Sequence, residues 1–377
     1  MKKSELFFLS KDNQTNIHMV IWEPDNKVYG VIQVVHGVTE HIMRYEEFAN
    51  YLNKGGIAVV GIDLIGHGLS TNNGANKMYF GPSGSWQYVV GDLDTCFLHA
   101  KELYPDVPHI MLGFSLGSFL TRTYMIDYPG KVDGAILVGT GQMSNFLLNI
   151  AHKVAIKESL KYGEKAITEK IKKLTFGTYN KHFRPNRTMY DWLCASTTAV
   201  DNYINDPLRG EAMSCGLFRE LLDGMKYTAN FTNVKKVDVN KPILILSGKD
   251  DPVGDFGKGV NKVYNSYKKA GILDVSVKMY DNLRHDILHE DNRFAIYDDI
   301  YGWLHSKLLR SIPILEDEVS LDGVKDNESR YEKALSKAQV SSNVVKESIV
   351  AGELQKQQEA SLNRSETIKF DNDMDNK

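Results

Sequence analysis

Residues 109–118 read His-Ile-Met-Leu-Gly-Phe-Ser-Leu-Gly-Ser, and this stretch decides the fold. Its apolar start predicts a buried strand, and the run from Phe119 to Tyr128 predicts a helix. Between them, Gly113 to Gly117 fits the pattern Gly-x-Ser-x-Gly, in which two residues without a Cβ permit a sharp strand-to-helix turn. Such a turn would hold the Ser115 hydroxyl at the edge of a sheet, beside a helix N-terminus that favours negative charge. The alternative is a glycine-rich turn whose serine only caps the helix.

Strand-like and helix-like patterns alternate on both sides of this stretch. Short apolar runs rich in β-branched residues, typical of buried strands, occur at 17–22, 30–35, 57–62, 134–138, 242–246 and 275–280. Helical patterns lie between them, for example at 44–52, 86–103, 260–269 and 294–309. The alternation predicts an α/β protein with a mostly parallel central sheet and helices on both faces.

Two segments depart from this alternation. Residues 143–235 contain amphipathic patterns but no clear buried strand, which predicts a helical insertion between two strands of a core formed by 1–142 and 236–314. Residues 315–377 carry 14 acidic and 9 basic side chains and only two aromatic ones. That composition predicts a charged, disordered C-terminal tail.

Composition excludes several classes of function. The 377 residues are 42% hydrophobic and 25% charged, as in a globular protein, and the net charge of −3 gives no general attraction to nucleic acid or to anionic membranes. No apolar run approaches the roughly 20 residues of a spanning helix, and the run Leu6–Leu9 is too short for a signal peptide. Because Cys96, Cys194 and Cys215 lack metal or disulfide spacing, we expect a cytoplasmic protein.

Candidate partners for the serine follow two later strands. A serine hydroxyl becomes a good nucleophile only when a base takes its proton. Asp250 and Asp251 follow the next-to-last predicted strand, and His285 follows the last one. Because parallel strands present their carboxyl ends at one edge of a sheet, we expect these side chains near Ser115. His289, one helical turn further, is the alternative base, and either aspartate could instead cap a turn.

Histidines in two other loops have competing explanations. The block beginning His36-Gly37 follows the strand at 30–35, where such a pair commonly supplies one backbone N–H of an oxyanion hole. The residue after the serine, Leu116, would supply the second N–H. His36 and His67 could also be read as metal ligands, but neither has carboxylate or cysteine partners at ligand spacing. We therefore expect structural histidines and no metal.

Five blocks in this order resemble motifs of the α/β-hydrolase superfamily. They read HGVTEHIMRY from His36, DLIGHGLS from Asp63, GFSLGS from Gly113, GKDDPV from Gly248 and HDILHE from His285. The continuation Glu-His-x-x-Arg-Tyr of the first block is similar to the monoacylglycerol lipase and lysophospholipase branch, the S33-type serine hydrolases. The resemblance covers about residues 10 to 310.

The resemblance implies a catalytic triad and an oxyanion hole, made by the side chains of Ser115, Asp251 and His285 and the backbone N–H groups of Val38 and Leu116. Spacing from Gly248 in the family pattern favours Asp251 over Asp250.

The resemblance also implies that Glu40 and Arg44 orient the polar head of an acylglycerol. The alternative for this pair is an ion pair that only holds the loop. One departure concerns Val38-Thr39, where the family often has glycine or another small residue.

The function implied is hydrolysis of monoacylglycerol or lysophospholipid-like esters through an acyl-enzyme, without a cofactor. The insertion at 143–235 corresponds to the superfamily's cap, which could contact lipid aggregates or membranes. Seven apolar side chains of the insertion could line an acyl tunnel, although packing of the cap onto the sheet is the favoured role for any single one of them: Phe146, Leu147, Leu148, Leu217, Phe218, Leu221 and Leu222. The alternatives are a short-chain carboxylesterase, an amidase or peptidase on the same triad, and a non-catalytic binding protein. No pattern indicates the oligomeric state.

Overall fold

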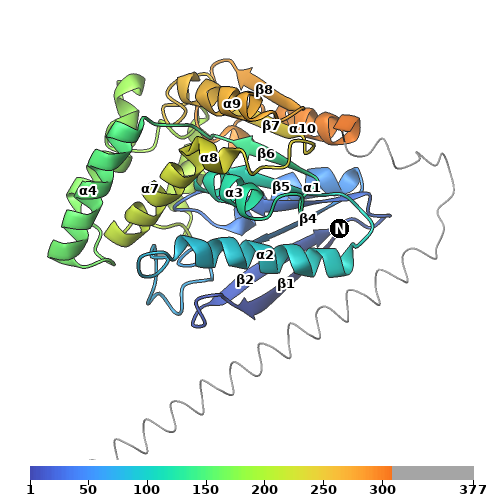
Figure 1. Ribbon diagram of the computed structural model, residues 1–377, viewed down its shortest axis with the longest axis horizontal. Helices are drawn as coiled ribbons and strands as arrows, with labels where there is room; N and C mark the ends of the chain where they lie inside the picture. Colours follow the sequence, from blue (N-terminus) through green and yellow to red (C-terminus); the bar gives the residue numbers. More distant parts are fainter. Residues whose placement is uncertain (308–377) are drawn as a thin grey trace, which may run out of the picture.

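A single eight-stranded sheet runs through the centre of the computed structural model, which describes residues 1–307 (Figure 1). The strands lie in the order β1-β2-β4-β3-β5-β6-β7-β8. Their bounds are β1 Lys2–Leu9, β2 Asn16–Glu23, β3 Gly30–Val35, β4 Ile57–Ile62, β5 His109–Phe114, β6 Gly134–Val138, β7 Ile243–Gly248 and β8 Val275–Tyr280. The predicted tail at 315–377 and the last residues of the predicted core, 308–314, lie outside the described residues.

The direction of the strands confirms the predicted sheet. β3 to β8 are parallel, and each pairs in a regular register with its neighbours. β2 is antiparallel to β4, and β1 is antiparallel to β2 at the edge of the sheet. All the carboxyl ends of the parallel strands therefore meet at one edge, where polar loops can come together.

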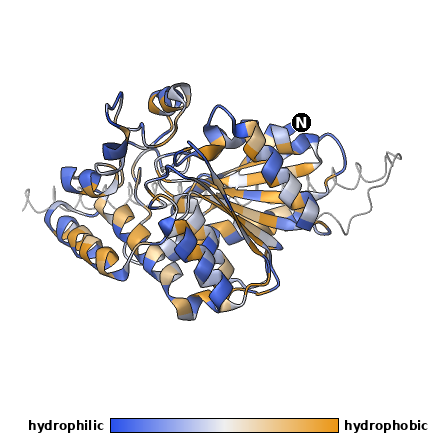
Figure 2. Ribbon diagram, turned by 90° about the horizontal axis from the view of Figure 1, so that it is seen from above, coloured by the Kyte–Doolittle hydropathy of each residue, from blue (hydrophilic) through white to orange (hydrophobic). Residues whose placement is uncertain are grey.

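Helices cover both faces of the sheet (Figures 1 and 2). α1 (Glu46–Lys54) and α10 (Arg293–Lys307) pack on one face, and α2 (Trp86–Leu103), α3 (Leu116–Asp127) and α9 (Lys258–Ala270) pack on the other. The alternation of side chains along a strand separates the two cores: in β3, Val31 and Val35 join one and Ile32 and Val34 join the other. The helix predicted at 44–52 begins with the 3-10 turn η1 (Ile42–Tyr45).

The segment between β6 and β7, called the helical insertion below, contains helices and no strand. It contains α4 Asn145–Tyr162, α5 Glu169–Thr175, the 3-10 turn η2 Tyr179–Phe183, α6 Thr197–Asn205, α7 Cys215–Ala229 and α8 Phe231–Val234. α4 and α7 lie side by side, and α7 packs against α3 of the sheet layer (Figure 1). Within residues 1–307, no helix has the length and apolar character that crossing a membrane requires.

Candidate active site

Ser115 lies in the sharp turn between β5 and α3. Its backbone has φ 51° and ψ −116°, a conformation that residues with a side chain rarely adopt. Both flanking glycines pack tightly against other backbone. A Cβ on Gly117 would lie 1.9 Å from the carbonyl oxygen of Val35, and a Cβ on Gly113 would lie 2.3 Å from that of Gly117. The turn therefore needs both glycines, and it places a strained serine at the carboxyl end of β5, as functional sites often do.

The side chains of Ser115, His285 and Asp251 form one hydrogen-bonded chain. Ser115 Oγ lies 2.8 Å from His285 Nε2, and His285 Nδ1 lies 3.0 Å from each carboxylate oxygen of Asp251. The carboxylate is fully buried and also accepts a 2.8 Å hydrogen bond from the backbone N–H of Val253. Because the carboxylate accepts the Nδ1 proton, His285 Nε2 is left free to take the proton of Ser115.

Two aromatic rings and a glycine fix the orientation of His285. The ring centroids of Phe114 and Trp192 lie 5.0 Å and 5.3 Å from that of the imidazole. Gly139 has φ +60°, and a Cβ there would lie 2.9 Å from His285 Cε1. The imidazole is 1% exposed, so little water competes for its hydrogen bonds.

The alternative acid and base lie outside this chain. The backbone N–H of Asp250 donates to the carbonyl of Leu283 at 3.0 Å, and its half-buried side chain makes no contact with His285. His289 uses both ring nitrogens elsewhere: Nδ1 lies 2.8 Å from Asp286, and Nε2 lies 3.0 Å from the carbonyl of Arg44. The geometry therefore favours the pairing of His285 with Asp251.

The predicted oxyanion N–H groups flank the nucleophile. Leu116 is the first residue of α3, where a helix leaves its N–H groups without intrahelical partners. Hydrogen bonds fix the backbone groups on both sides of the Val38 N–H. The Gly37 N–H donates to Glu40 Oε1 at 2.5 Å, and the Val38 carbonyl accepts from Thr39 Oγ1 at 2.6 Å. Within residues 1–307, neither the Val38 nor the Leu116 N–H donates to a protein acceptor. Both are available to a developing oxyanion.

The sequence pattern of the serine aminopeptidase S33 hydrolases matches residues 26–292, more than two thirds of the chain. The chain belongs to this family. The match takes in all five motif blocks, from the loop at His36 to the end of the block at His285.

Comparisons with individual proteins extend this finding. The monoacylglycerol lipase of Mycolicibacterium smegmatis is 24% identical over 292 residues, which cover 76% of this chain and 92% of that protein. The structure of a thermostable carboxyl esterase from Bacillus coagulans, in complex with glycerol, has a TM-score of 0.76 at 27% identity and covers 81% of this chain and 99% of its own. A soluble variant of the monoglyceride lipase of Saccharomyces cerevisiae shares the fold, with a TM-score of 0.64 at 16% identity and coverage of 81% and 97%.

The family and these relatives make the chain a serine-type hydrolase of carboxylic esters with the α/β-hydrolase fold. Both the predicted fold class and the predicted enzyme class are confirmed.

Glu40 and Arg44 form a buried ion pair close to Ser115 and His285. Arg44 donates to Glu40 and, at 3.0 Å, to Asp286, the residue after the base. The Glu40 carboxylate, whose side chain is 2% exposed, also accepts from the Gly37 N–H and from the Tyr45 hydroxyl at 2.8 Å. Both carboxylate oxygens are thus occupied within the loop. These contacts favour the alternative in which the pair holds the loop, and Arg44 also lines the cavity at Ser115.

Asp286 completes this buried network. Burial alone would raise the pKa of its carboxyl, but the interactions with His289 and Arg44, which both donate hydrogen bonds to it, outweigh that effect and hold the pKa below its usual value. Asp286 is therefore ionised and binds the guanidinium of Arg44, which also contacts Glu40.

His36 and His67 have structural positions. His36 Nδ1 donates to the Gly37 carbonyl at 2.7 Å, and its Nε2 accepts from the Leu64 N–H at 3.0 Å. His67 Nδ1 donates to the Ile65 carbonyl at 2.9 Å. Burial lowers the pKa of His36 to about 3 and that of His67 to about 4, so both rings are neutral at physiological pH. In the part of the chain that the structure describes, no group of three or more ligating side chains could hold a metal ion.

A cavity of about 20 Å³ adjoins Ser115, which is room for about one water molecule. Its lining comes from the core and from the helical insertion: Val38, Thr39, Glu40, Arg44, Phe114, Ser115, Phe176, Trp192, Leu193, Tyr203 and His285. Six of these were not predicted as site residues: Thr39, Phe114, Phe176, Trp192, Leu193 and Tyr203. Phe176, Trp192, Leu193 and Tyr203 come from short helices and connecting segments of the insertion, where no motif marks the side chains that face Ser115.

For five of the seven candidate tunnel residues the structure favours the packing alternative, and the other two are exposed. Phe146 and Leu147 lie on the outer face of α4, 73% and 50% exposed. The other residues of that prediction, Leu148, Leu217, Phe218, Leu221 and Leu222, belong to or pack against the core that joins the insertion to the sheet layer. None of the seven lines the cavity. An amphipathic pattern shows that a helix has a buried face, but not which neighbour that face contacts.

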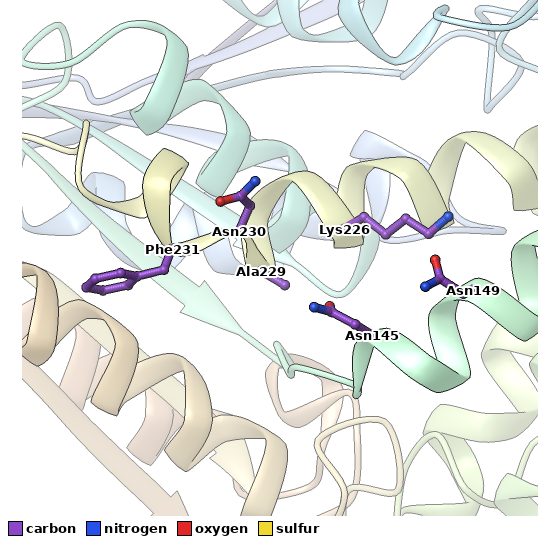
Figure 3. A pocket seen from close by; sticks show the side chains of 6 residues that line it. All are labelled: Asn145, Asn149, Lys226, Ala229, Asn230 and Phe231. Carbon is purple, nitrogen blue, oxygen red and sulfur yellow. The ribbon is translucent and has the colours of Figure 1, made fainter.

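A larger hollow of about 540 Å³ lies away from the triad, between α4 and the α7–α8 corner (Figure 3). It is lined by Asn145, Asn149, Lys226, Ala229, Asn230 and Phe231. It contains none of the nucleophile, base, acid or oxyanion residues, and its amide and ammonium groups do not form an acyl site.

Proposed function

We propose that this hydrolase cleaves the ester bond of monoacylglycerols or lysophospholipid-like lipids through an acyl-enzyme. The observation that carries the proposal is the hydrogen-bonded chain from Ser115 to Asp251 beside two available backbone N–H groups. The names of several relatives, including the Mycolicibacterium smegmatis monoacylglycerol lipase, support the lipid substrate.

In the proposed reaction, Ser115 Oγ attacks the ester carbonyl while His285 Nε2 takes its proton. Asp251 orients the imidazole and stabilises the imidazolium that forms. The N–H groups of Val38 and Leu116 donate to the oxyanion of the tetrahedral intermediate. His285 then protonates the departing alcohol. It next activates a water molecule that attacks the acyl-enzyme, which releases the fatty acid and restores the serine.

The helical insertion at 143–235 acts, in this proposal, as a cap on a core of 1–142 and 236–314. Trp192 and Leu193 from the insertion form part of the cavity wall. The cavity is too small for a fatty acyl chain. The insertion is also tied to the loop of the base, because the N–H groups of Ala195 and Ser196 donate to Glu290 at 2.6 Å and 2.9 Å. A lipid substrate therefore enters only when the insertion moves away from Ser115. When the insertion returns, it excludes water from the site.

The same small cavity favours a second candidate, a short-chain carboxylesterase. An acetyl group needs far less room than a dodecanoyl group. Its binding would therefore require a smaller movement of the insertion. The dependence of rate on chain length distinguishes the two candidates.

For the lipid hydrolase, kcat/KM should rise steadily from acetyl to dodecanoyl esters. Each buried methylene contributes up to about 0.8 kcal/mol, which is about fourfold in kcat/KM, until the acyl pocket ends. At equal chain length, the monoacylglycerol should exceed the ethyl ester if Arg44 donates to the glycerol hydroxyls. Initial rates on the two homologous series measure both effects. A flat or falling series would contradict the lipid proposal and favour the short-chain esterase.

The outer face of α4 supports contact with a lipid surface. Apolar and basic side chains recur on it at spacings of three and four residues, and all of them are exposed: Phe146, Leu147, Ile150, Lys153, Lys157, Leu160 and Lys161. An apolar helix face with interspersed lysines is suited to an anionic lipid surface, because the rings and chains enter the interface while the ammonium groups bind head groups. We therefore propose that α4 docks the cap on anionic lipid.

The double variant Phe146→Ser/Leu160→Ser should bind vesicles at least about tenfold more weakly than the wild type, because it removes the two most exposed apolar groups of α4. Co-sedimentation with phosphatidylcholine vesicles, with and without phosphatidylglycerol, measures the change. Leu273→Ser is the matched control, since Leu273 is 71% exposed but follows α9 on the core. Equal binding by the double variant and the control would contradict docking through α4.

A further inference from the structure

The oxyanion loop, residues 36–41, is held by the helical insertion as well as by the core. The Tyr203 hydroxyl in α6 lies 2.6 Å from Thr39 Oγ1, and the Gly210 N–H donates to the Thr39 carbonyl at 3.3 Å. Two residues of the insertion thus contact the side chain and the backbone of a single loop residue.

A third contact lies beside these two. His41 Nε2, at the end of the loop, lies 2.7 Å from Asp206, which follows α6. The guanidinium of Arg44 lies over the ring of Tyr203, 5.2 Å from its centroid. The end of α6 therefore packs against the loop, and all of these contacts would be lost together if the insertion moved.

The hydrogen-bond chain has one consistent direction. Thr39 Oγ1 lies 2.6 Å from both the Val38 carbonyl oxygen and the Tyr203 hydroxyl. A carbonyl oxygen can only accept, so the single hydroxyl proton of Thr39 goes to Val38. Tyr203 must then donate to Thr39. Each bond polarises the next in this buried setting, so the two bonds strengthen each other.

Thr39 needs this support because its backbone is strained. Its φ is +60°, in the left-handed region that favours glycine and that a β-branched residue rarely adopts. A residue in such a conformation persists only where its surroundings hold it. The contacts from Tyr203 and Gly210 help to stabilise Thr39 in this conformation. Thr39 directly follows Val38, whose N–H is an oxyanion donor in the proposed reaction.

We propose that Tyr203 is a positioning residue that couples seating of the helical insertion to formation of the oxyanion hole. With the insertion in contact with the loop, the chain from Tyr203 through Thr39 fixes the Val38–Thr39 peptide. Because Val38 joins this peptide to the preceding one, the fixed peptide also restricts the direction of the Val38 N–H. When the insertion moves to admit substrate, its hydrogen bonds to Thr39 break. They form again when the insertion closes. The inference rests on the proposed ester hydrolysis, which it deepens.

The test uses Tyr203→Phe, which removes the hydroxyl and keeps the ring over Arg44. On a small soluble ester such as p-nitrophenyl acetate, kcat should fall about tenfold with little change in KM. The basis is that complete loss of one oxyanion donor costs about a hundredfold to a thousandfold, and a loosened donor loses part of that. Affinity for a trifluoromethyl ketone, which forms a tetrahedral adduct with the serine, should fall in parallel with kcat/KM. A purely structural role would not change this affinity selectively.

Tyr190→Phe is the matched control. Its ring packs edge-on against Tyr203, with centroids 5.3 Å apart, but its hydroxyl contacts Arg209 at 3.3 Å rather than the oxyanion loop. This variant should keep the wild-type kcat and the wild-type affinity for the ketone.

A second pair of variants keeps the inference falsifiable if Tyr203→Phe is poorly folded. Thr39→Val removes the hydroxyl but keeps the branched side chain, and Thr39→Ser, which keeps the hydroxyl, should recover most of the lost kcat. The double variant Tyr203→Phe/Thr39→Val should be no slower than Thr39→Val alone, because the two hydroxyls act as one unit. Full additivity, or wild-type kcat and ketone affinity in Tyr203→Phe, would overturn the coupling. A wild-type protein that hydrolyses no ester would instead overturn the proposed function.

Discussion

Ser115→Ala is expected to lower kcat for ester hydrolysis by about a millionfold while the protein stays folded. Loss of the nucleophile of a serine triad costs on the order of a millionfold in a well-studied protease, because the remaining groups act only through it. The substitution removes one oxygen atom and leaves both supporting glycines and the hydrogen bond from the Ser115 N–H to the Val138 carbonyl. Initial rates on a short soluble ester, with thermal melting of the same sample, measure both parts.

Ser118→Ala is the control for this variant. Ser118 lies three residues along α3, and its hydroxyl donates to the Ser115 carbonyl at 2.6 Å rather than to His285. Its loss should reduce kcat by less than about tenfold, as expected for a single backbone-directed hydrogen bond. If Ser115→Ala retained activity within tenfold of the wild type, Ser115 would not be the nucleophile.

Asp251→Asn is expected to have the second-largest effect, a loss of about ten thousandfold in kcat. An amide in place of the carboxylate stabilises the wrong tautomer of His285, so Nε2 carries a proton and no longer accepts one from the serine. Asp250→Asn is the matched control, because Asp250 lies one residue away and makes no contact with the imidazole. It should retain most of the activity. The reverse result, with Asp250→Asn severe and Asp251→Asn mild, would move the acid by one residue.

Most of the sheet could be predicted because its strands are buried on both faces. The runs at 30–35, 57–62 and 134–138 agree with β3, β4 and β6 at both ends. β1 was missed, since its side chains alternate between solvent and core and only Leu6 and Phe8 are fully buried. A half-exposed edge strand with lysines at its start gives a weak apolar signal.

The sequence could predict that Ser115, Asp251 and His285 lie close together, because the topology brings their distant loops to one place. Ser115 follows β5, Asp251 follows β7 and His285 follows β8, all at the same edge of the sheet. The local sequence after each strand then determines which side chains lie at that edge of the sheet. No comparable rule places the contacts of the insertion: Tyr203 and Thr39 are 164 residues apart, and neither segment carries a pattern that refers to the other.

The position of the nucleophile is tested most directly by mapping the site of fluorophosphonate labelling with mass spectrometry. The reagent phosphonylates a serine hydroxyl that a neighbouring base activates. We expect one phosphonyl group per chain, on the peptide that contains Ser115, with labelling absent in Ser115→Ala and strongly slowed in Asp251→Asn. Label on a different serine, or full activity in protein whose Ser115 is phosphonylated, would contradict the account.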